Sequence, residues 1–213
     1  MKQNFKEIKT FLIENYKWII LIICMITLLL LIEDVMNEDI VSFDEKGYFI
    51  VSKYLISDNR NPIAKFITNF AGMFWLIGLS VVLLIVIKKK KIGLSIFINL
   101  ALSALVNFIL KQILQRPRPI ENRIIEENGY SLPSGHSMVS MAFYGYLIYL
   151  IYKYIKNKYL KISLIALLIL LILSIGISRI YLGVHYTSDV FAGFLLAIVY
   201  LIIYTHVITN EET

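Results

Sequence analysis

Residues 92–119 read IGLSIFINLALSALVNFILKQILQRPRP, an apolar run of near-membrane length that ends in two prolines. A helix needs about 20 mostly apolar residues to cross the hydrocarbon layer of a membrane, and residues 92–113 supply them. A proline pushes its preceding residue toward extended geometry, so the helix is expected to end before Pro117. Polar residues recur at every fourth position and therefore share one face of the predicted helix: Asn99, Ser103, Asn107 and Lys111.

The rest of the chain also contains apolar runs of near-membrane length. Hydrophobic residues make up 58% of its 213 residues and the mean hydropathy is +0.73, which is too apolar for an ordinary soluble domain. We predict an all-α polytopic membrane protein, a single domain of residues 1–213 built as a bundle of six transmembrane helices, with no separate soluble domain. The predicted spans are 17–32, 69–87, 92–113, 137–152, 162–177 and 189–206.

The first span follows a basic leader, as the apolar core of a signal peptide does. It is followed by Glu33-Asp34-Val35-Met36, which offers no small-residue cleavage site, so we expect an uncleaved first helix. The single cysteine, Cys24, lies within this span, and no disulfide within the chain is possible.

Positive charges indicate the orientation in the membrane. Cytoplasmic segments carry an excess of Lys and Arg, so both termini are expected in the cytoplasm. The run of four lysines at 88–91 is explained by this rule and by contact with anionic lipid. No nucleic-acid partner is predicted. Twelve lysines lie in segments that six spans place on the side of the C-terminus: Lys2, Lys6, Lys9, Lys17, Lys88, Lys89, Lys90, Lys91, Lys153, Lys156, Lys158 and Lys161.

Three short polar blocks lie near the opposite ends of the apolar runs. With the N-terminus inside, all three fall on the outer face, so we expect them to converge on one extracytoplasmic site. Their side chains could bind a phosphate dianion, attack its phosphorus and protonate the leaving group. The blocks are Lys111 with Arg118-Pro119, Pro133-Ser134-Gly135-His136, and Ser178-Arg179 with His185 and Asp189.

Each block suits phosphate chemistry for its own reason. The planar guanidinium of Arg118 matches phosphate oxygens. Turn residues before the fourth span predict a helix start, whose free N–H groups bind phosphate, and Gly135 lets the backbone approach a ligand closely. His185 precedes Asp189 by four residues, so the carboxylate can accept the Nδ1 proton and leave Nε2 free as a nucleophile.

Simpler explanations exist for several polar residues. Asn99 and Ser103 could form a polar seam between packed helices, and residues 133–136 alone could be a plain helix cap with a surface histidine. Arg116, between Lys111 and Arg118, does not take one of the positions specified by the pattern of the three blocks and is expected to be a surface charge. His206, near the inner end of the sixth span, is expected to be an interface residue.

The blocks resemble the three signature motifs of the type-2 phosphatidic acid phosphatase superfamily, K-x6-RP, PSGH and SR-x5-H-x3-D, and all eleven specified positions match. The motif-bearing core is about residues 107–190, and Thr187 stands where many relatives carry proline. The resemblance implies that His185 attacks phosphorus, His136 protonates the leaving oxygen and Asp189 orients the nucleophile. It also implies that five residues hold the phosphate oxygens: Lys111, Arg118, Ser134, Gly135 and Arg179.

The implied activity is that of an integral-membrane phosphatase acting on a phosphorylated membrane lipid through a phosphohistidine, in the cytoplasmic membrane of a bacterium. Three fixed cations can take the place of metal ions, so neither a metal nor another cofactor is expected. Undecaprenyl pyrophosphate is the expected substrate, and phosphatidylglycerophosphate or phosphatidic acid are alternatives. A lipid phosphotransferase would use the same residues, whereas a non-catalytic lipid binder or transporter would need neither histidine. Nothing in the sequence indicates the oligomeric state.

One segment outside the spans has mixed charges and many aromatic residues. Residues 42–66 could form helices that lie in the membrane interface and frame a lipid entrance. The alternative is that they simply pack over the end of the bundle.

Overall fold

A computed structural model describes the chain from residue 2 to residue 211, with side chains from 14 to 208. The described residues form α-helices and one short 3-10 helix, and no strand occurs among them, which confirms the all-α prediction. The α-helices are α1 (Lys2–Met36), α2 (Val41–Leu55), α3 (Asn61–Asn69), α4 (Met73–Val86), α5 (Lys90–Leu114), α6 (Gly135–Tyr154), α7 (Lys158–Tyr181) and α8 (Thr187–Glu211), with η1 (Asp58–Arg60) between α2 and α3.

Helices cover five of the six predicted spans and extend beyond the predicted ends, whereas the span predicted for 69–87 is interrupted at 70–72 and only Met73–Val86 of it forms α4. α7 covers Lys158–Tyr181 where the sequence predicted 162–177. Within the described part of the chain, four helices are long and apolar enough to cross a membrane, and a bent pair with an angle of 44° is a candidate fifth. The four are Glu14–Met36, Lys90–Leu114, Lys158–Tyr181 and Thr187–Ile208, and the pair is Asp58–Asn69 with Met73–Val86.

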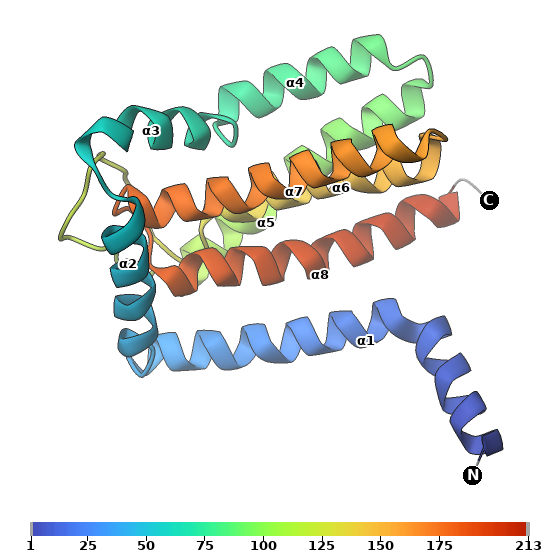
Figure 1. Cartoon of the computed structure of the whole chain (residues 1–213), viewed down its shortest axis with the longest axis horizontal. Coiled ribbons are helices and arrows are strands. Elements are labelled where there is room, and N and C mark those ends of the chain that lie inside the picture. The colour runs from blue at the N-terminus through green and yellow to red at the C-terminus, as the bar shows by residue number, and fades with distance from the viewer. Residues whose placement is uncertain (1, 212–213) are drawn as a thin grey trace.

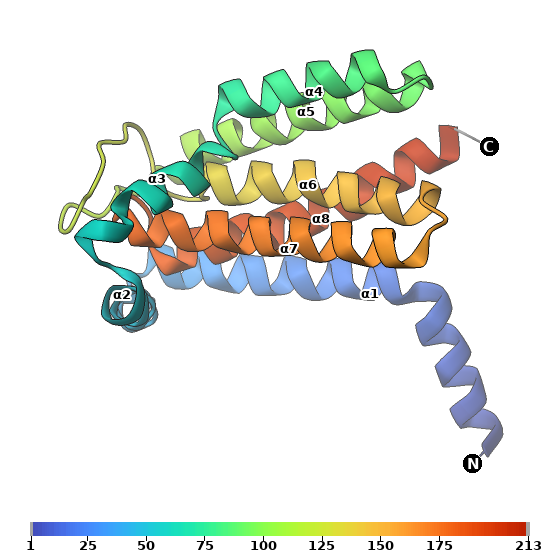
Figure 2. The ribbon, with the colours of Figure 1, turned by 45° about the horizontal axis from the view of Figure 1, so that its top comes forward.

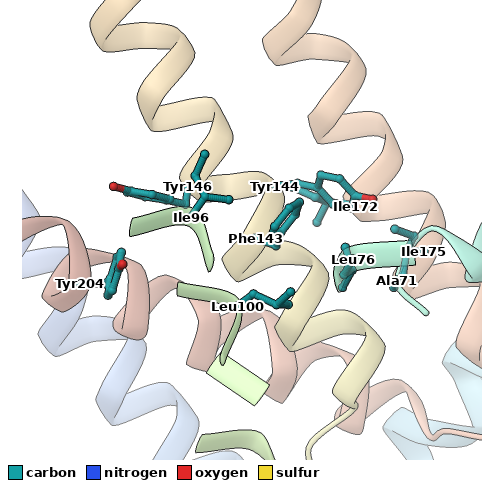
Figure 3. Close-up of a cluster of buried hydrophobic side chains, with 10 residues drawn as sticks. All are labelled: Ala71, Leu76, Ile96, Leu100, Phe143, Tyr144, Tyr146, Ile172, Ile175 and Tyr204. Carbon is teal, nitrogen blue, oxygen red and sulfur yellow. The ribbon is translucent and has the colours of Figure 1, made fainter. Parts of the chain in front are cut away.

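The helix α6 lies at the centre of the bundle. It packs against α5, α7 and α8, while α1 packs on α8 and α4 on α5. Figure 2 shows these helices running side by side. Because its neighbours surround it, α6 carries buried polar residues such as Ser137, Ser140 and Tyr146, whereas Tyr152 and Tyr154 near its C-terminal end are exposed. The main apolar cluster forms around it (Figure 3) and consists of Ala71, Leu76, Ile96, Leu100, Phe143, Tyr144, Tyr146, Ile172, Ile175 and Tyr204.

Large apolar side chains also cover the outside of the bundle. A soluble protein buries most such residues, and contiguous exposed apolar surface marks contact with another apolar phase. The exposed set includes Ile22, Ile23, Leu29, Leu30, Ile85, Val86, Phe108, Ile113, Leu167, Leu170 and Ile203.

Two helices form a cap at one end of the bundle. α2 lies across the bundle axis (Figure 1) and packs against α7 and α8, and α3 packs against α7. Segment 42–66 is therefore largely helical, as predicted. The outer side of α2 exposes Phe43, Phe49, Ile50 and Tyr54.

Both chain ends lie at the end of the bundle opposite to α2 (Figures 1 and 2). The lysine-rich turns between α4 and α5 and between α6 and α7 lie at the same end as the chain termini. Of the predicted inner lysines, the side chains of Lys2, Lys6 and Lys9 lie outside the described residues.

Candidate active site

The three blocks meet at the end of the bundle that carries α2. A Cβ atom added to Gly135 would lie 3.0 Å from Oδ1 of Asn107 and 3.8 Å from Cε of Lys111, so the first and second blocks are in contact. The backbone N–H of Ser134 donates to the carbonyl of Asp189 at 3.0 Å, which joins the second block to the third.

Lys111 anchors the loop between α5 and α6. Its Nζ donates to the carbonyl oxygens of Tyr130 at 2.5 Å and Ser131 at 3.2 Å. The ammonium group is thereby held beside the start of α6. The polar face predicted for α5 is confirmed, because Asn99, Ser103 and Asn107 are all buried.

Arg118 is buried and ties two loops together. Its Nε and Nη2 donate to the carbonyls of Gly129 at 3.0 Å and Asn128 at 3.1 Å. Its Nη1 donates to the carbonyl of Val184 at 3.0 Å and lies 3.0 Å from Nε2 of His185. The guanidinium is therefore fixed directly beside the imidazole.

The surroundings of His185 select its neutral form and its tautomer. Arginine has only donors, so Nε2 must accept from Arg118 and the ring proton resides on Nδ1. That nitrogen faces Oδ2 of Asp189 at 3.4 Å, and the same oxygen accepts the N–H of Tyr186 at 2.9 Å. Burial, followed by the charges of Arg179, Arg118 and Lys111, holds the pKa of His185 well below its ordinary value of 6.5.

The second block begins a helix, as predicted. Ser134 is the N-cap of α6, and its Oγ accepts from the N–H of Ser137 at 3.4 Å and from the hydroxyl of Ser137 at 2.9 Å. Gly135 and His136 are the first two residues of α6 and both remain partly accessible. The free N–H groups of this first turn point to the same end of the bundle as Lys111 and Arg118.

Arg179 is 1% exposed at the end of α7. Its Nη1 donates to Oγ1 of Thr68 at 2.8 Å, and its Nη2 forms an ion pair with Glu127. Its Nε is buried and has no partner among the described residues. An unpaired buried donor on a cation is costly, and an anionic oxygen is the partner that it suits best.

Glu127 is a member of the site that the sequence did not reveal. It lies in the loop between α5 and α6, and its side chain is 28% exposed. Burial alone would raise the pKa of Glu127, but the charge and hydrogen bond of Arg179, followed by His136 and Arg118, lower it. The carboxylate is thus ionised and lies among the cations of the three blocks.

The prediction that Arg116 is a surface charge is wrong. Its side chain is 13% exposed and forms ion pairs of 2.7 Å with both Asp44 and Asp189. The chain turns back over the start of α8 after α5, which buries the guanidinium between two carboxylates. The one feature of the sequence that could have pointed to a role for Arg116 is the Arg-Pro pair at 116–117, which repeats directly at Arg118-Pro119.

A cavity of about 410 Å³ opens beside His185, on the side of α2. Its wall includes Asp44, Arg116, His185 and Tyr186, together with apolar residues of α1 and α2. The phosphate-binding candidates Lys111, Ser134 and Arg179 do not line it.

The donor set of the site fits an anion better than a metal ion. Lysine and arginine side chains dominate it and offer hydrogen-bond donors only. Within the described residues, no group of three or more His, Cys, Asp or Glu side chains is placed to hold a metal ion.

Two characterised relatives are similar to this chain in sequence. Phosphatidylglycerophosphatase B of Bacillus subtilis (strain 168) is 30% identical over 142 residues, which cover 65% of this chain and 70% of the relative. Undecaprenyl-diphosphatase of Sulfolobus acidocaldarius is 26% identical over 189 residues, which cover 86% of each protein.

Two solved structures share the fold. The PAP2-type phosphatidylglycerolphosphate phosphatase of Bacillus subtilis superposes with a TM-score of 0.80 at 24% identity, over 89% of this chain and 96% of that one. LpxE of Aquifex aeolicus superposes with a TM-score of 0.62 at 22% identity, over 75% and 92%. The sequence profile of the PAP2 superfamily matches residues 92–212. Since that match spans more than half of the chain and includes all three blocks, the protein belongs to the PAP2 superfamily.

Proposed function

We propose that this protein is a membrane lipid phosphate phosphatase that works through a phosphohistidine on His185. The observation that carries the proposal is the arrangement around this residue. The unprotonated Nε2 of a neutral imidazole accepts a hydrogen bond from Arg118, which an incoming phosphate oxygen could take over, and its Nδ1–H faces Asp189. A nucleophile of this kind, flanked by fixed cations, suits an attack on phosphorus better than mere binding of a lipid.

In the proposed mechanism, Lys111, Arg118 and Arg179 bind the non-bridging phosphate oxygens with the hydroxyl of Ser134 and the N–H of Gly135. The buried Nε of Arg179 gains a partner when an oxygen binds. Nε2 of His185 then forms a bond to phosphorus while the ester oxygen leaves, and His136 gives that oxygen its proton. Phosphoryl transfer depends mainly on such positioning and charge stabilisation.

Asp189 stabilises the positive charge that develops on His185 during the attack. Water then attacks the phosphohistidine, His136 takes a proton from it, and inorganic phosphate leaves with the free imidazole restored. The three cations balance the phosphate charge throughout, so we propose that turnover needs no metal ion.

The substrate in this proposal is a lipid with a terminal phosphate group. The similarity to phosphatidylglycerophosphatase B favours phosphatidylglycerophosphate as this lipid. Undecaprenyl pyrophosphate, the substrate expected from the sequence, is the second candidate and is favoured by the similarity to an undecaprenyl-diphosphatase.

We also propose a single domain of residues 1–213 with six transmembrane helices, in which the α3–α4 pair and α6 join the four clear spans. The lysine-rich turns and both termini are assigned to the cytoplasm, and the site to the extracytoplasmic face. Supporting this orientation, the three blocks lie at the end opposite to the termini (Figure 1).

The test is phosphate release by the detergent-purified protein with a chelator present, compared with His185→Ala. His206→Ala is the matched control, because that histidine packs on Trp18 with a ring distance of 5.1 Å, away from the three blocks. We expect release by the parent and His206→Ala but not by His185→Ala. Activity that persists in His185→Ala would contradict the mechanism.

The same assay separates the candidate substrates and the phosphotransferase alternative. The panel contains phosphatidylglycerophosphate, undecaprenyl pyrophosphate, phosphatidic acid and a soluble phosphomonoester, ranked by kcat/KM. Labelled phosphate recovered on a second lipid or alcohol, in place of inorganic phosphate, would identify a transferase. Dependence on Mg²⁺ after chelation would contradict metal independence.

A further inference from the structure

The carboxylate of Asp44, on α2, reaches the start of α8. Its Oδ1 accepts the backbone N–H of Ser188 at 2.7 Å, and its Oδ2 accepts the hydroxyl of Ser188 at 2.9 Å. Helix N-termini have unpaired N–H groups and a positive dipole end. A residue 144 positions away in the sequence therefore caps the helix that carries Asp189.

Arg116 connects this cap to the candidate catalytic pair. Its Nη2 donates to Oδ2 of Asp44 at 2.7 Å, while its Nη1 donates to Oδ1 of Asp189 at 2.7 Å and to the hydroxyl of Ser188 at 2.8 Å. Its guanidinium also lies over the ring of Tyr186, 4.1 Å from the centroid. The plane of the guanidinium is thus held from several directions.

The charges in this network depend on one another. Asp189 is fully buried and Asp44 is 6% exposed, so water solvates neither carboxylate well and each needs a cation beside it. Burial alone would lower the pKa of Arg116, but the charges and hydrogen bonds of Asp189 and Asp44 raise it. The guanidinium therefore remains charged and forms an ion pair with each of the two carboxylates.

The two oxygens of Asp189 have different partners. Oδ1 is held by Arg116, and Oδ2 faces Nδ1 of His185 and the N–H of Tyr186. Because Arg116 occupies Oδ1, the carboxylate plane is fixed and Oδ2 is the oxygen that meets the imidazole. A free carboxylate could rotate and lose this alignment.

We propose that Arg116 and Asp44 are positioning residues for the His185–Asp189 pair, acting through Oδ1 of Asp189. Neither residue takes a specified position of the three signature motifs. The inference rests on the proposed function, because its effect is measured through the attack by His185.

The first test compares Arg116→Ala, Arg116→Lys and Asp44→Asn with the parent. Misplacement of a reacting group by about 1 Å can cost about 100-fold in rate. We expect kcat to fall by about that factor in Arg116→Ala and by about tenfold in the two conservative variants, with KM nearly unchanged. The control is Lys46→Ala, an exposed residue of α2 that does not line the cavity and should keep the kinetic constants of the parent.

The second test is chemical rescue. Arg116 and Asp44 both line the cavity of about 410 Å³, so removal of the arginine side chain leaves a hole that a guanidinium ion can enter. Guanidinium, at concentrations far below those that unfold the protein, should raise kcat of Arg116→Ala at least tenfold and leave the parent and Lys46→Ala unaffected. If Arg116 only stabilised the fold, its removal would lower the unfolding temperature, and guanidinium would not restore kcat in a saturable way.

The outcomes separate this inference from the proposed function. An inactive parent, or an active His185→Ala, overturns the proposed function. An active parent with an inactive His185→Ala and a fully active Arg116→Ala overturns only the positioning role. If Arg116→Ala does not fold, Arg116→Lys decides, because it keeps the charge and loses the planar bridge. A folded Arg116→Lys with the kcat of the parent contradicts the inference.

Discussion

Glu127 forms an ion pair with Arg179, so one of the three cations assigned to the phosphate already has an anionic partner within the protein. A phosphate group that enters the site must share or displace this carboxylate. The ligand-free site is thus partly neutralised, which reduces the cost of holding several buried cations close together.

Glu127→Gln is expected to lower KM by about two- to fivefold, because a competing anion is removed. This factor corresponds to ~0.5–1 kcal/mol, the size typical of a partly exposed ion pair. Steady-state kinetics with a lipid phosphate will measure it. Glu126→Gln is the matched control, since the side chain of Glu126 is 93% exposed and pairs only loosely with Arg123 at 3.9 Å. A KM that rises in Glu127→Gln would show that the carboxylate helps to hold the substrate.

His136→Ala is expected to affect substrates according to their leaving group. A lipid alkoxide leaves poorly without a proton, and a general acid contributes about 10²- to 10⁴-fold in such reactions. The loss of kcat should therefore be large with a lipid phosphate and much smaller with nitrophenyl phosphate, whose leaving group needs no proton. Equal losses with both substrates would assign His136 to binding instead of proton transfer.

The pH dependence of kcat/KM should have an acid limb below pH 6.5. His185 must be neutral to attack, and burial with its neighbouring cations keeps its pKa below the ordinary value of 6.5. Activity is therefore retained as the pH falls through 6.5. It is lost only when the pH falls below the depressed pKa of His185. Two substrates whose phosphate groups differ in pKa will show whether the limb belongs to the enzyme. An acid limb of the enzyme centred above pH 6.5 would contradict the neutral, desolvated imidazole of His185.

Tyr144→Phe is expected to loosen α4 from the bundle. The hydroxyl of Tyr144 donates to the carbonyl of Phe70 at 2.6 Å and accepts from Nε1 of Trp75 at 3.1 Å. Removal of the hydroxyl leaves both partners unpaired, which costs about 1 to 3 kcal/mol. Thermal unfolding in detergent should show a lower midpoint, while kcat stays close to that of the parent. Tyr159→Phe is the control, because Tyr159 is 83% exposed.

The sequence predicted the features that depend on local periodicity. The four-residue spacing from Asn99 to Lys111 placed these side chains on one face, and the structure buries that face in the bundle. The Pro-Ser-Gly pattern predicted the start of α6, and Ser134 is its N-cap. Five of the predicted spans were too short, because polar residues continue each helix beyond its apolar run. The span predicted for 69–87 was too long, since the chain turns at 70–72 and α4 covers Met73–Val86.

The sequence did not predict partners that only the tertiary path brings together. Arg116 and Asp44 are 72 residues apart, and no periodic pattern links a residue of α2 to the end of α5. Glu127 lies in a loop beside another glutamate, and nothing local distinguishes the one that reaches Arg179. Residues outside signature motifs, held by charge in a folded site, are the ones that sequence analysis misses.

The buried polar face of α5 has a consequence for how the protein is made. Asn99 and Ser103 are fully buried, and neither amide atom of Asn99 has a partner within the described residues. Before α6 and α8 are synthesised, this face has no protein to cover it, and polar groups are costly in hydrocarbon. α5 therefore depends on α6 and α8, which follow it in the chain, to cover its polar face.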